Sequence, residues 1–89
     1  MRVVLRSVGN PDFGQDPTRE LWGCEPRRVE NVSNFKEASD VCLKFIRENN
    51  LGGGNWAGGD IYSGHERVGK VCYNGRIVDK DGQFINFKL

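Results

Sequence analysis

The sequence predicts an α+β domain in which one helix packs on one face of an antiparallel β-meander, in the order β-(β)-α-β-β-β-β. Two observations support this class. One stretch with helical periodicity lies in the middle of the chain, and two Asx-Gly dipeptides separate short strand-like runs near its end. The chain has 89 residues, so we expect a single domain over residues 1–89 with a small core.

The helix is expected to begin after Asn34, which can cap it together with Glu37 three residues later. Apolar residues then recur at spacings of three and four and form one stripe: Phe35, Ala38, Val41, Cys42, Phe45 and Ile46. Charged residues of alternating sign line the other side, where we also expect Leu43. Gly52 is well placed to end the helix in the left-handed conformation, with Leu51 folding back onto the stripe.

The segments before the helix are expected to be mostly extended. Residues 2–8 are rich in valine and leucine and predict a strand that joins the meander at an edge. Residues 9–25 combine glycines, prolines and acidic residues, and this composition predicts a long loop or arm. The run Arg27–Val32 predicts a second, short strand at a sheet edge.

Four short runs after the helix predict the meander. They are Asp60–Ser63, Arg67–Tyr73, Arg76–Asp79 and Gln83–Leu89. The dipeptides Asn74-Gly75 and Asp81-Gly82 between the later runs are strong short-range signals of β-hairpins. In the last run Ile85, Phe87 and Leu89 alternate, so we expect them on one face of the sheet.

Composition and charge narrow the class of function. The net charge is +1 and the signs are interleaved, whereas a dedicated nucleic-acid binder commonly carries a basic patch. No apolar run approaches a membrane span, and the N-terminal run is broken by Arg6 and does not resemble a signal peptide. Cys24, Cys42 and Cys72 lack metal-site spacing and are expected to be reduced thiols. We therefore expect a cytoplasmic protein that needs no cofactor or metal.

The stretch LGGGNWAGGD at residues 51–60 places five glycines around Asn55 and Trp56. A phosphate loop is excluded, because these glycines follow a helix, and a helix C-terminus presents carbonyl groups and partial negative charge. Two interpretations stay open. The glycines allow the backbone to pack tightly under the Trp56 ring, or the loop displays Asn55 and Trp56 as a contact surface.

The loop NPDFGQDP at residues 10–17 is the second dense polar stretch. Asp12 and Asp16, with Gln15 between them, could bind a cation or act as acid and base, which makes a small hydrolase, with or without a metal, an alternative function. The competing interpretation is turn chemistry, in which Asp and Asn side chains bond their own backbone. No complete ligand set such as an EF-hand loop is present.

A third interpretation is a stacking platform for single-stranded nucleic acid. The aromatic and basic residues that could form it are Trp22, Trp56, Tyr62, Tyr73, Arg27, Arg28, Arg67 and Arg76. Acidic residues interrupt every basic run, so packing of these aromatic side chains in the core is the favoured interpretation. A catalytic pair of His65 and Cys72 is not expected, because Cys72 lies too far along the following strand.

Three motifs together resemble those of a family of small bacterial proteins. They are GNPDFGQDP at 9–17, EAS-VC--FI-EN-LGGGNW-GG at 37–59 and VCYNGRI at 71–77. The resemblance implies a relationship to small proteins carried in mobile integron gene cassettes, part of the mobile metagenome. It brings no catalytic residue with it. The segment DKDGQFINFKL adds a further hairpin to the pattern, so the resemblance does not imply an open sheet edge in this chain.

The leading hypothesis from sequence is a small binding module without catalysis, which recognises a protein partner or a small polar ligand. The three motifs are loops or turns, and if they converge at one end of the sheet they form a shallow polar and aromatic site. Its residues would be Asn10, Asp12, Gln15, Asn55 and Trp56, with Trp56 as the anchor. A homodimer formed through a sheet edge is a further expectation.

Overall fold

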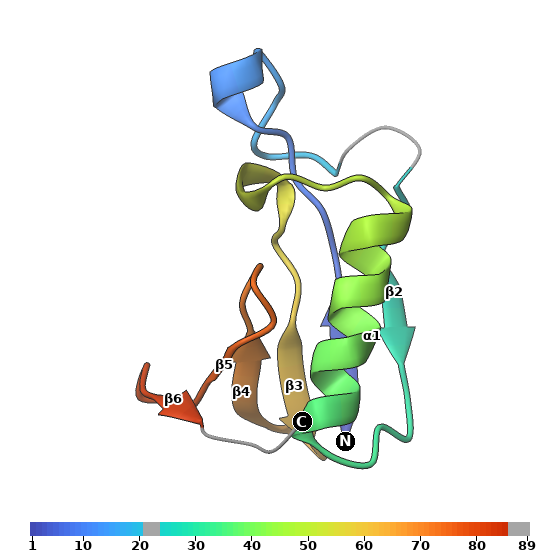
Figure 1. The fold of residues 1–89 in the computed structure, drawn as a ribbon, viewed down its shortest axis with the longest axis vertical. Coiled ribbons are helices and arrows are strands. Elements are labelled where there is room, and N and C mark those ends of the chain that lie inside the picture. Colours follow the sequence, from blue (N-terminus) through green and yellow to red (C-terminus); the bar gives the residue numbers. More distant parts are fainter. Residues whose placement is uncertain (21–23, 86–89) are drawn as a thin grey trace.

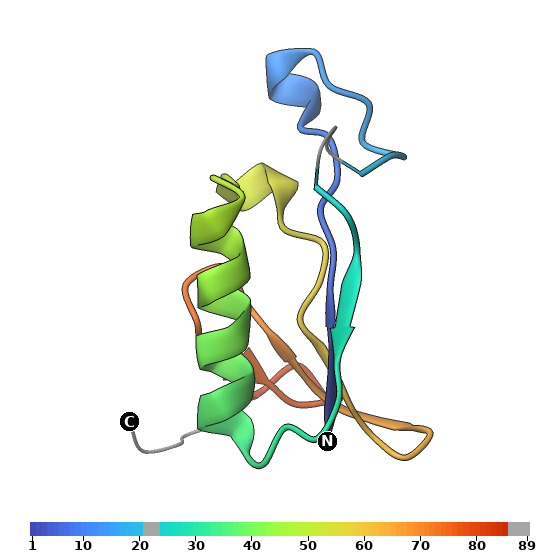
Figure 2. The same cartoon turned by 90° about the vertical axis from the view of Figure 1, so that its right-hand side faces the viewer.

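The computed structural model describes residues 1–20 and 24–85 and confirms the α+β class. Six strands form one antiparallel sheet in the order β2-β1-β3-β4-β5-β6, and one helix lies against one face of it (Figures 1 and 2). The helical elements are η1 Pro11–Phe13, α1 Phe35–Glu48 and η2 Gly53–Asn55. The strands are β1 Arg2–Leu5, β2 Arg27–Val29, β3 Asp60–Ser63, β4 Glu66–Val71, β5 Ile77–Val78 and β6 Phe84–Ile85.

The strands occur where the sequence predicts them, but several are shorter. β1 joins the meander beside β3, and β2 then forms the outer edge of the sheet on that side. β4 ends at Val71, since Tyr73 already belongs to the turn that leads into β5. In the last run, Ile85 is half-buried and packs against the core, whereas Phe87 and Leu89, which we expected on the same face, lie outside the described residues.

Helix α1 begins where its local sequence predicts. The Asn34 side chain accepts a hydrogen bond from the backbone N–H of Glu37 at 2.8 Å, and the Glu37 carboxylate accepts one from the N–H of Ser33 at 3.2 Å. The first bond satisfies a backbone donor that the first turn of a helix leaves free, and the second ties Glu37 back to the residue before the cap. The start of α1 is thus specified by residues within a few positions of it.

The end of α1 differs from the prediction. Asn50, and not Gly52, adopts the left-handed conformation, with φ of 52° against −85° for Gly52. The N–H of Leu51 donates to the carbonyl of Ile46 at 3.0 Å, and the N–H of Asn50 donates to that of Arg47 at 3.3 Å. These two bonds form the motif that commonly closes a helix, and asparagine tolerates its left-handed position better than other residues with a side chain. The prediction for Gly52 was therefore wrong.

The hydrophobic core lies between α1 and the sheet. Its buried members are Val3, Leu5, Cys24, Val32, Ala38, Cys42, Phe45, Ile46, Leu51, Ile61, Val71 and Ile77. Burial raises the pKa of the Cys42 thiol to about 12, as expected for a core cysteine without a charged partner. Leu43 is half-buried and not outward-facing as predicted, because the turn at Gly75 approaches its side chain.

The two faces of the sheet differ in what covers them. Val3, Leu5 and Ile61 are buried on the face that carries α1, whereas Arg2 and Tyr62 lie on the opposite face, where their side chains stack. No element within the described ranges 1–20 and 24–85 forms a layer on that opposite face (Figure 2). We call it the outer face of the sheet.

Residues 9–20, here called the arm, extend beyond one end of the sheet. Figure 1 shows the arm in blue at the top, next to the segment that follows α1. That segment, residues 51–59, is here called the glycine loop. The GNPD motif of the arm and the LGGGNW motif of the glycine loop thus meet at one end of the molecule, which is the condition on which the site suggested from sequence depends.

The difference between Asn50 and Gly52 can be tested by alanine substitution. We expect Asn50→Ala to lower the free energy of unfolding by about 1 kcal/mol, because alanine is strained in the left-handed conformation. Gly52→Ala should leave that free energy unchanged or raise it by up to about 1 kcal/mol, since φ there suits any residue and the nearest atom to an added Cβ is 3.5 Å away. Urea denaturation of both variants measures the difference. A larger loss in Gly52→Ala would contradict this account.

Candidate functional site: the arm and the glycine loop

The side chain of Asn55 joins the glycine loop to the arm. Its amide nitrogen donates to the carbonyl of Val8 at 3.0 Å and to the Oε1 atom of Gln15 at 3.1 Å, and its Oδ1 atom accepts from the N–H of Gly52 at 3.1 Å. The backbone carbonyl of Asn55 also accepts from the N–H of Val8 at 2.9 Å. Asn55 is buried, so these bonds form where an unpaired amide would be costly.

Gln15 and Asn10 extend the contact into the arm. The Oε1 atom of Gln15 accepts a second hydrogen bond, from the N–H of Asn10 at 2.8 Å. The side chain of Asn10 in turn accepts from the N–H of Asp12 at 3.0 Å and caps η1. A Cβ at Gly54 would lie 2.4 Å from the Asn10 amide nitrogen, so any other residue at position 54 would displace the Asn10 side chain that caps η1.

Trp56 supports the same junction from the core side. Its Nε1 atom donates to the carbonyl of Val71 at 2.9 Å, and its ring lies 6.1 Å from that of Phe45. Gly59 has a φ of +96°, and a Cβ there would clash with the Val71 carbonyl and approach the Trp56 ring at 3.1 Å. Trp56 is half-buried and packs against the core. The packing interpretation of the glycine loop therefore agrees with the contacts of Trp56. The display interpretation does not hold for Asn55, which is buried and hydrogen-bonded to the arm.

The third motif also contacts the glycine loop. The hydroxyl of Tyr73 donates to the carbonyl of Leu51 at 3.1 Å, and the Tyr73 ring lies 3.7 Å from where a Cβ of Gly53 would stand. The first and third motifs quoted for the family resemblance thus each contact the glycine loop, which belongs to the second.

The junction displays Phe13, which sequence reasoning did not single out. Phe13 is 78% exposed, the most exposed of the large hydrophobic residues described. It ends a single 3-10 turn, which the side chain of Asn10 caps and which Gly14 terminates with a φ of 72°. The signal that could have identified it is local: an Asn-Pro start and a glycine stop leave room for one turn with no buried side.

The two carboxylates of the hydrolase hypothesis are both exposed. Asp16 accepts from the N–H and the hydroxyl of Thr18 at 2.9 and 2.6 Å, and these bonds lower its pKa below the ordinary value. Asp16 lines a hollow of about 580 Å³ together with Gln15 and Arg6, but Asp12 does not. Among residues 1–20 and 24–85, no cluster of three or more potential metal-ligating side chains occurs.

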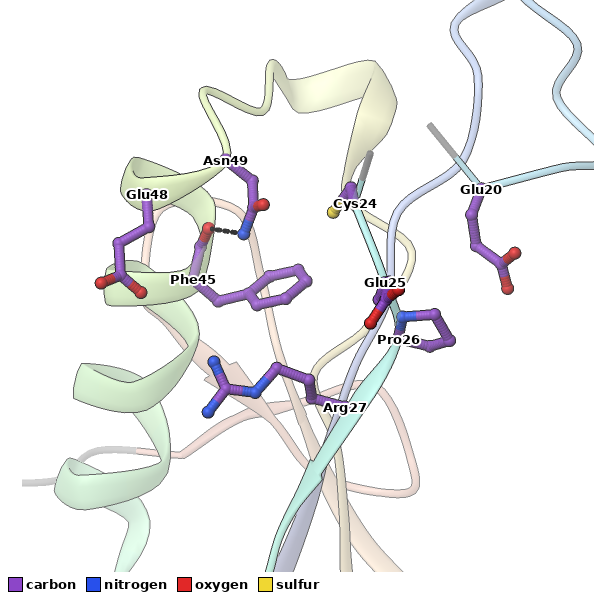
Figure 3. A pocket seen from close by; sticks show the side chains of 8 residues that line it. All are labelled: Glu20, Cys24, Glu25, Pro26, Arg27, Phe45, Glu48 and Asn49. Carbon is purple, nitrogen blue, oxygen red and sulfur yellow. Dashed lines mark hydrogen bonds between the residues drawn. The ribbon is translucent and has the colours of Figure 1, made fainter. Parts of the chain in front are cut away.

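A second hollow, of about 540 Å³, lies between the C-terminal end of α1 and the segment leading into β2 (Figure 3). Three carboxylates surround it, from Glu20, Glu25 and Glu48, and the Arg27 side chain extends toward α1 below Phe45. Trp22, which the sequence suggested as part of a stacking platform, lies in the range 21–23, outside the described part of the chain.

Comparison of the chain with protein-family models, with curated proteins and with solved structures finds no match. Within the described residues, no helix has the length and apolar character needed to cross a membrane. The site must therefore be interpreted from its own geometry, which brings Asn10, Gln15 and Asn55 into one hydrogen-bonded network, leaves Asp12 exposed beside it and packs Trp56 beneath it.

Removal of the Asn55 amide tests the junction. We expect Asn55→Ala to lower the free energy of unfolding by about 1–3 kcal/mol, because the Val8 carbonyl and the Gly52 N–H lose a buried partner. Asn49→Ala, which removes one hydrogen bond to a carbonyl at the end of α1, is the matched control and should cost less. Urea denaturation measures both variants. Equal losses in the free energy of unfolding would contradict the role of Asn55 in holding the arm.

The hydrogen bonds that Thr18 donates to Asp16 lead to a prediction about the pKa of the Asp16 carboxyl group. Thr18→Val removes the hydroxyl donor, which is the main cause of the lowered pKa, so the pKa of Asp16 should rise toward its ordinary value of 3.8. In the native protein the carboxylate should persist to lower pH than in the unfolded chain. Carboxyl-carbon NMR titration of both proteins measures the shift. A wild-type value at or above 3.8 would contradict the Thr18 contact.

Proposed function

We propose that this protein is a small binding module without catalysis, which recognises a protein partner through the arm, with Phe13 as the anchor. The single observation that carries the proposal is an almost fully exposed phenylalanine on a turn that internal hydrogen bonds hold in place. Exposed aromatic residues that enter a pocket of a partner supply much of the energy of protein interfaces.

In this proposal the residues singled out from sequence have roles that differ from those the sequence suggested. Asn10, Gln15 and Asn55 hold the arm, since their side chains are occupied by intramolecular hydrogen bonds. Asp12 stands beside Phe13, so a partner pocket with a donor or cation at its rim fits this arm. Trp56 acts as support beneath the junction instead of as the anchor.

Energetics favour the arm over the other exposed features. Full burial of a phenylalanine side chain stabilises a contact by about 1.5–3 kcal/mol, and a turn that is already ordered loses little conformational entropy on binding. A homodimer through a sheet edge would use β2, which has three residues and exposes Arg27 and Arg28, or β6, which has two residues. Short edges, and charged ones such as β2, disfavour strand pairing, so we base the proposal on the arm.

The structure offers fewer free side chains for the two alternative functions, binding of a small polar ligand and hydrolysis. A small polar ligand or a hydrolytic substrate would use the hollow beside Asp16, where Gln15 and Thr18 are already engaged within the arm. We further propose that the protein acts in the cytoplasm and is related to integron cassette proteins of bacteria. Three cysteines without disulfide or metal-site spacing support the first, and the three sequence motifs support the second.

Affinity capture from a nuclease-treated bacterial lysate, read by mass spectrometry, tests the proposal. Wild type should enrich a protein that Phe13→Ser loses by about tenfold or more, as expected for removal of an interface anchor. Phe84→Ser is the matched control, since Phe84 is also exposed, at 60%, but lies in the sheet. It should keep the partner. Equal enrichment by both variants, or no enrichment by wild type, would contradict a protein-binding arm.

A further inference from the structure

Several positively charged side chains lie together on the outer face of the sheet, although positive and negative residues alternate along the sequence. Successive residues of a strand point to opposite faces, and the strand register places the following side chains on the outer face: Arg2, Val4, Arg28, Asp60, Tyr62, Arg67, Lys70, Val78 and Phe84. The same alternation assigns Glu30, directly after β2, to this face, and Arg76 joins it through its contact with the Phe84 ring. Five of these are cations and two are carboxylates, on a chain whose net charge is +1. The outer face is therefore distinctly more basic than the remainder of the chain.

One of the two carboxylates is already engaged. Asp60 lies 2.9 Å from the Nε atom of Arg67 in an ion pair. Lys70 stands across from Asp60 on the neighbouring strand and across from Val78 on the next, so its ammonium group lies near the middle of the face. Arg28 is exposed on β2, across from Val4. Positive charge thus extends from one edge strand to the centre of the sheet.

Aromatic rings lie among these cations and pair with them. The guanidinium of Arg2 lies 4.9 Å from the ring centre of Tyr62, and that of Arg76 lies 4.2 Å from the ring centre of Phe84. Phe84 remains 60% exposed in spite of this contact. Planar guanidinium groups and aromatic rings are both surfaces on which nucleic-acid bases stack.

We propose that the outer face binds single-stranded nucleic acid. Arg28 and Lys70 contact phosphate groups, and bases stack on Phe84 and on the Arg2–Tyr62 pair. Six strands at a spacing of about 4.8 Å give a face about 24 Å wide, enough for several extended nucleotides. The combination of cations with exposed planar rings favours this occupant over an acidic peptide, which offers charge but no bases. The inference concerns the outer face alone and does not depend on the arm.

Fluorescence anisotropy with a labelled oligothymidylate of about 12 nucleotides tests this proposal. We expect binding at low salt that weakens steeply with salt, with the logarithm of the affinity falling by about 0.7 for each phosphate contact per tenfold increase in salt. Arg28→Gln/Lys70→Gln should lower the affinity by about tenfold and make the salt dependence shallower. Lys44→Gln/Arg47→Gln removes the same charge from exposed positions of α1 and should retain the affinity.

Stacking is tested separately from charge. Phe84→Leu keeps an apolar side chain but removes the ring, and should lower the affinity by about fivefold or more. Phe13→Leu makes the same change on the arm and should leave oligonucleotide affinity unchanged. Far-ultraviolet circular dichroism of each variant confirms that it folds. Absence of binding at low salt, equal losses in the sheet and helix double variants, or equal affinity for a polyglutamate peptide or an anionic vesicle would each overturn the proposal.

Discussion

The attachment of the arm to the domain depends on one buried amide, that of Asn55. Every residue from Pro11 to Glu20 is exposed, so hydrophobic burial contributes little to holding the arm. Its position instead follows from hydrogen bonds, which the Asn55 side chain makes to Val8 and Gln15, 47 and 40 residues away along the chain. If the arm moved away, the buried amide of Asn55 would lose these partners at a cost in free energy. The arm is therefore held in one position more strictly than an exposed loop usually is.

The glycines of the loop after α1 serve this junction. Gly54 admits Asn10, and Gly59 admits the Val71 backbone and the Trp56 ring, while a Cβ at Gly58 would lie 2.5 Å from the Arg6 backbone nitrogen. Several close backbone contacts thus require residues without side chains, at an entropic cost in the unfolded chain. These contacts join the core to the exposed turn. Trp56 packs under the junction on the core side, and η1, on the far side of the junction, holds Phe13 exposed to solvent.

The sequence predicts best those features that neighbouring residues determine. The start of α1 and the order of helix and strands along the chain were predicted, because caps, helical periodicity and Asx-Gly turns are local signals. The end of α1 was predicted wrongly, because the path of the chain after the helix decides which residue becomes left-handed. Residue 52 is extended instead, and its backbone N–H donates to the Asn55 side chain. The hydrogen bond between Gln15 and Asn55 could not be predicted, because these residues lie 40 positions apart in the sequence. The stacking platform considered from sequence already included Arg28, Tyr62 and Arg67 of the outer face. Its basic character was not predicted, because interleaved charges separate onto two faces only when the strand register is known.

An ordered arm is the central claim, and nitrogen-15 relaxation of the wild-type protein tests it most directly. The account predicts that the backbone amides of Asp12, Phe13 and Gln15 have order parameters near about 0.85, comparable to those of β1 and β3. Rigid presentation of Phe13 would then follow from the hydrogen bonds of Asn10, Gln15 and Asn55. Order parameters below about 0.6 across the arm, with a rigid sheet in the same sample, would contradict it, because a mobile arm could not present a preorganised anchor.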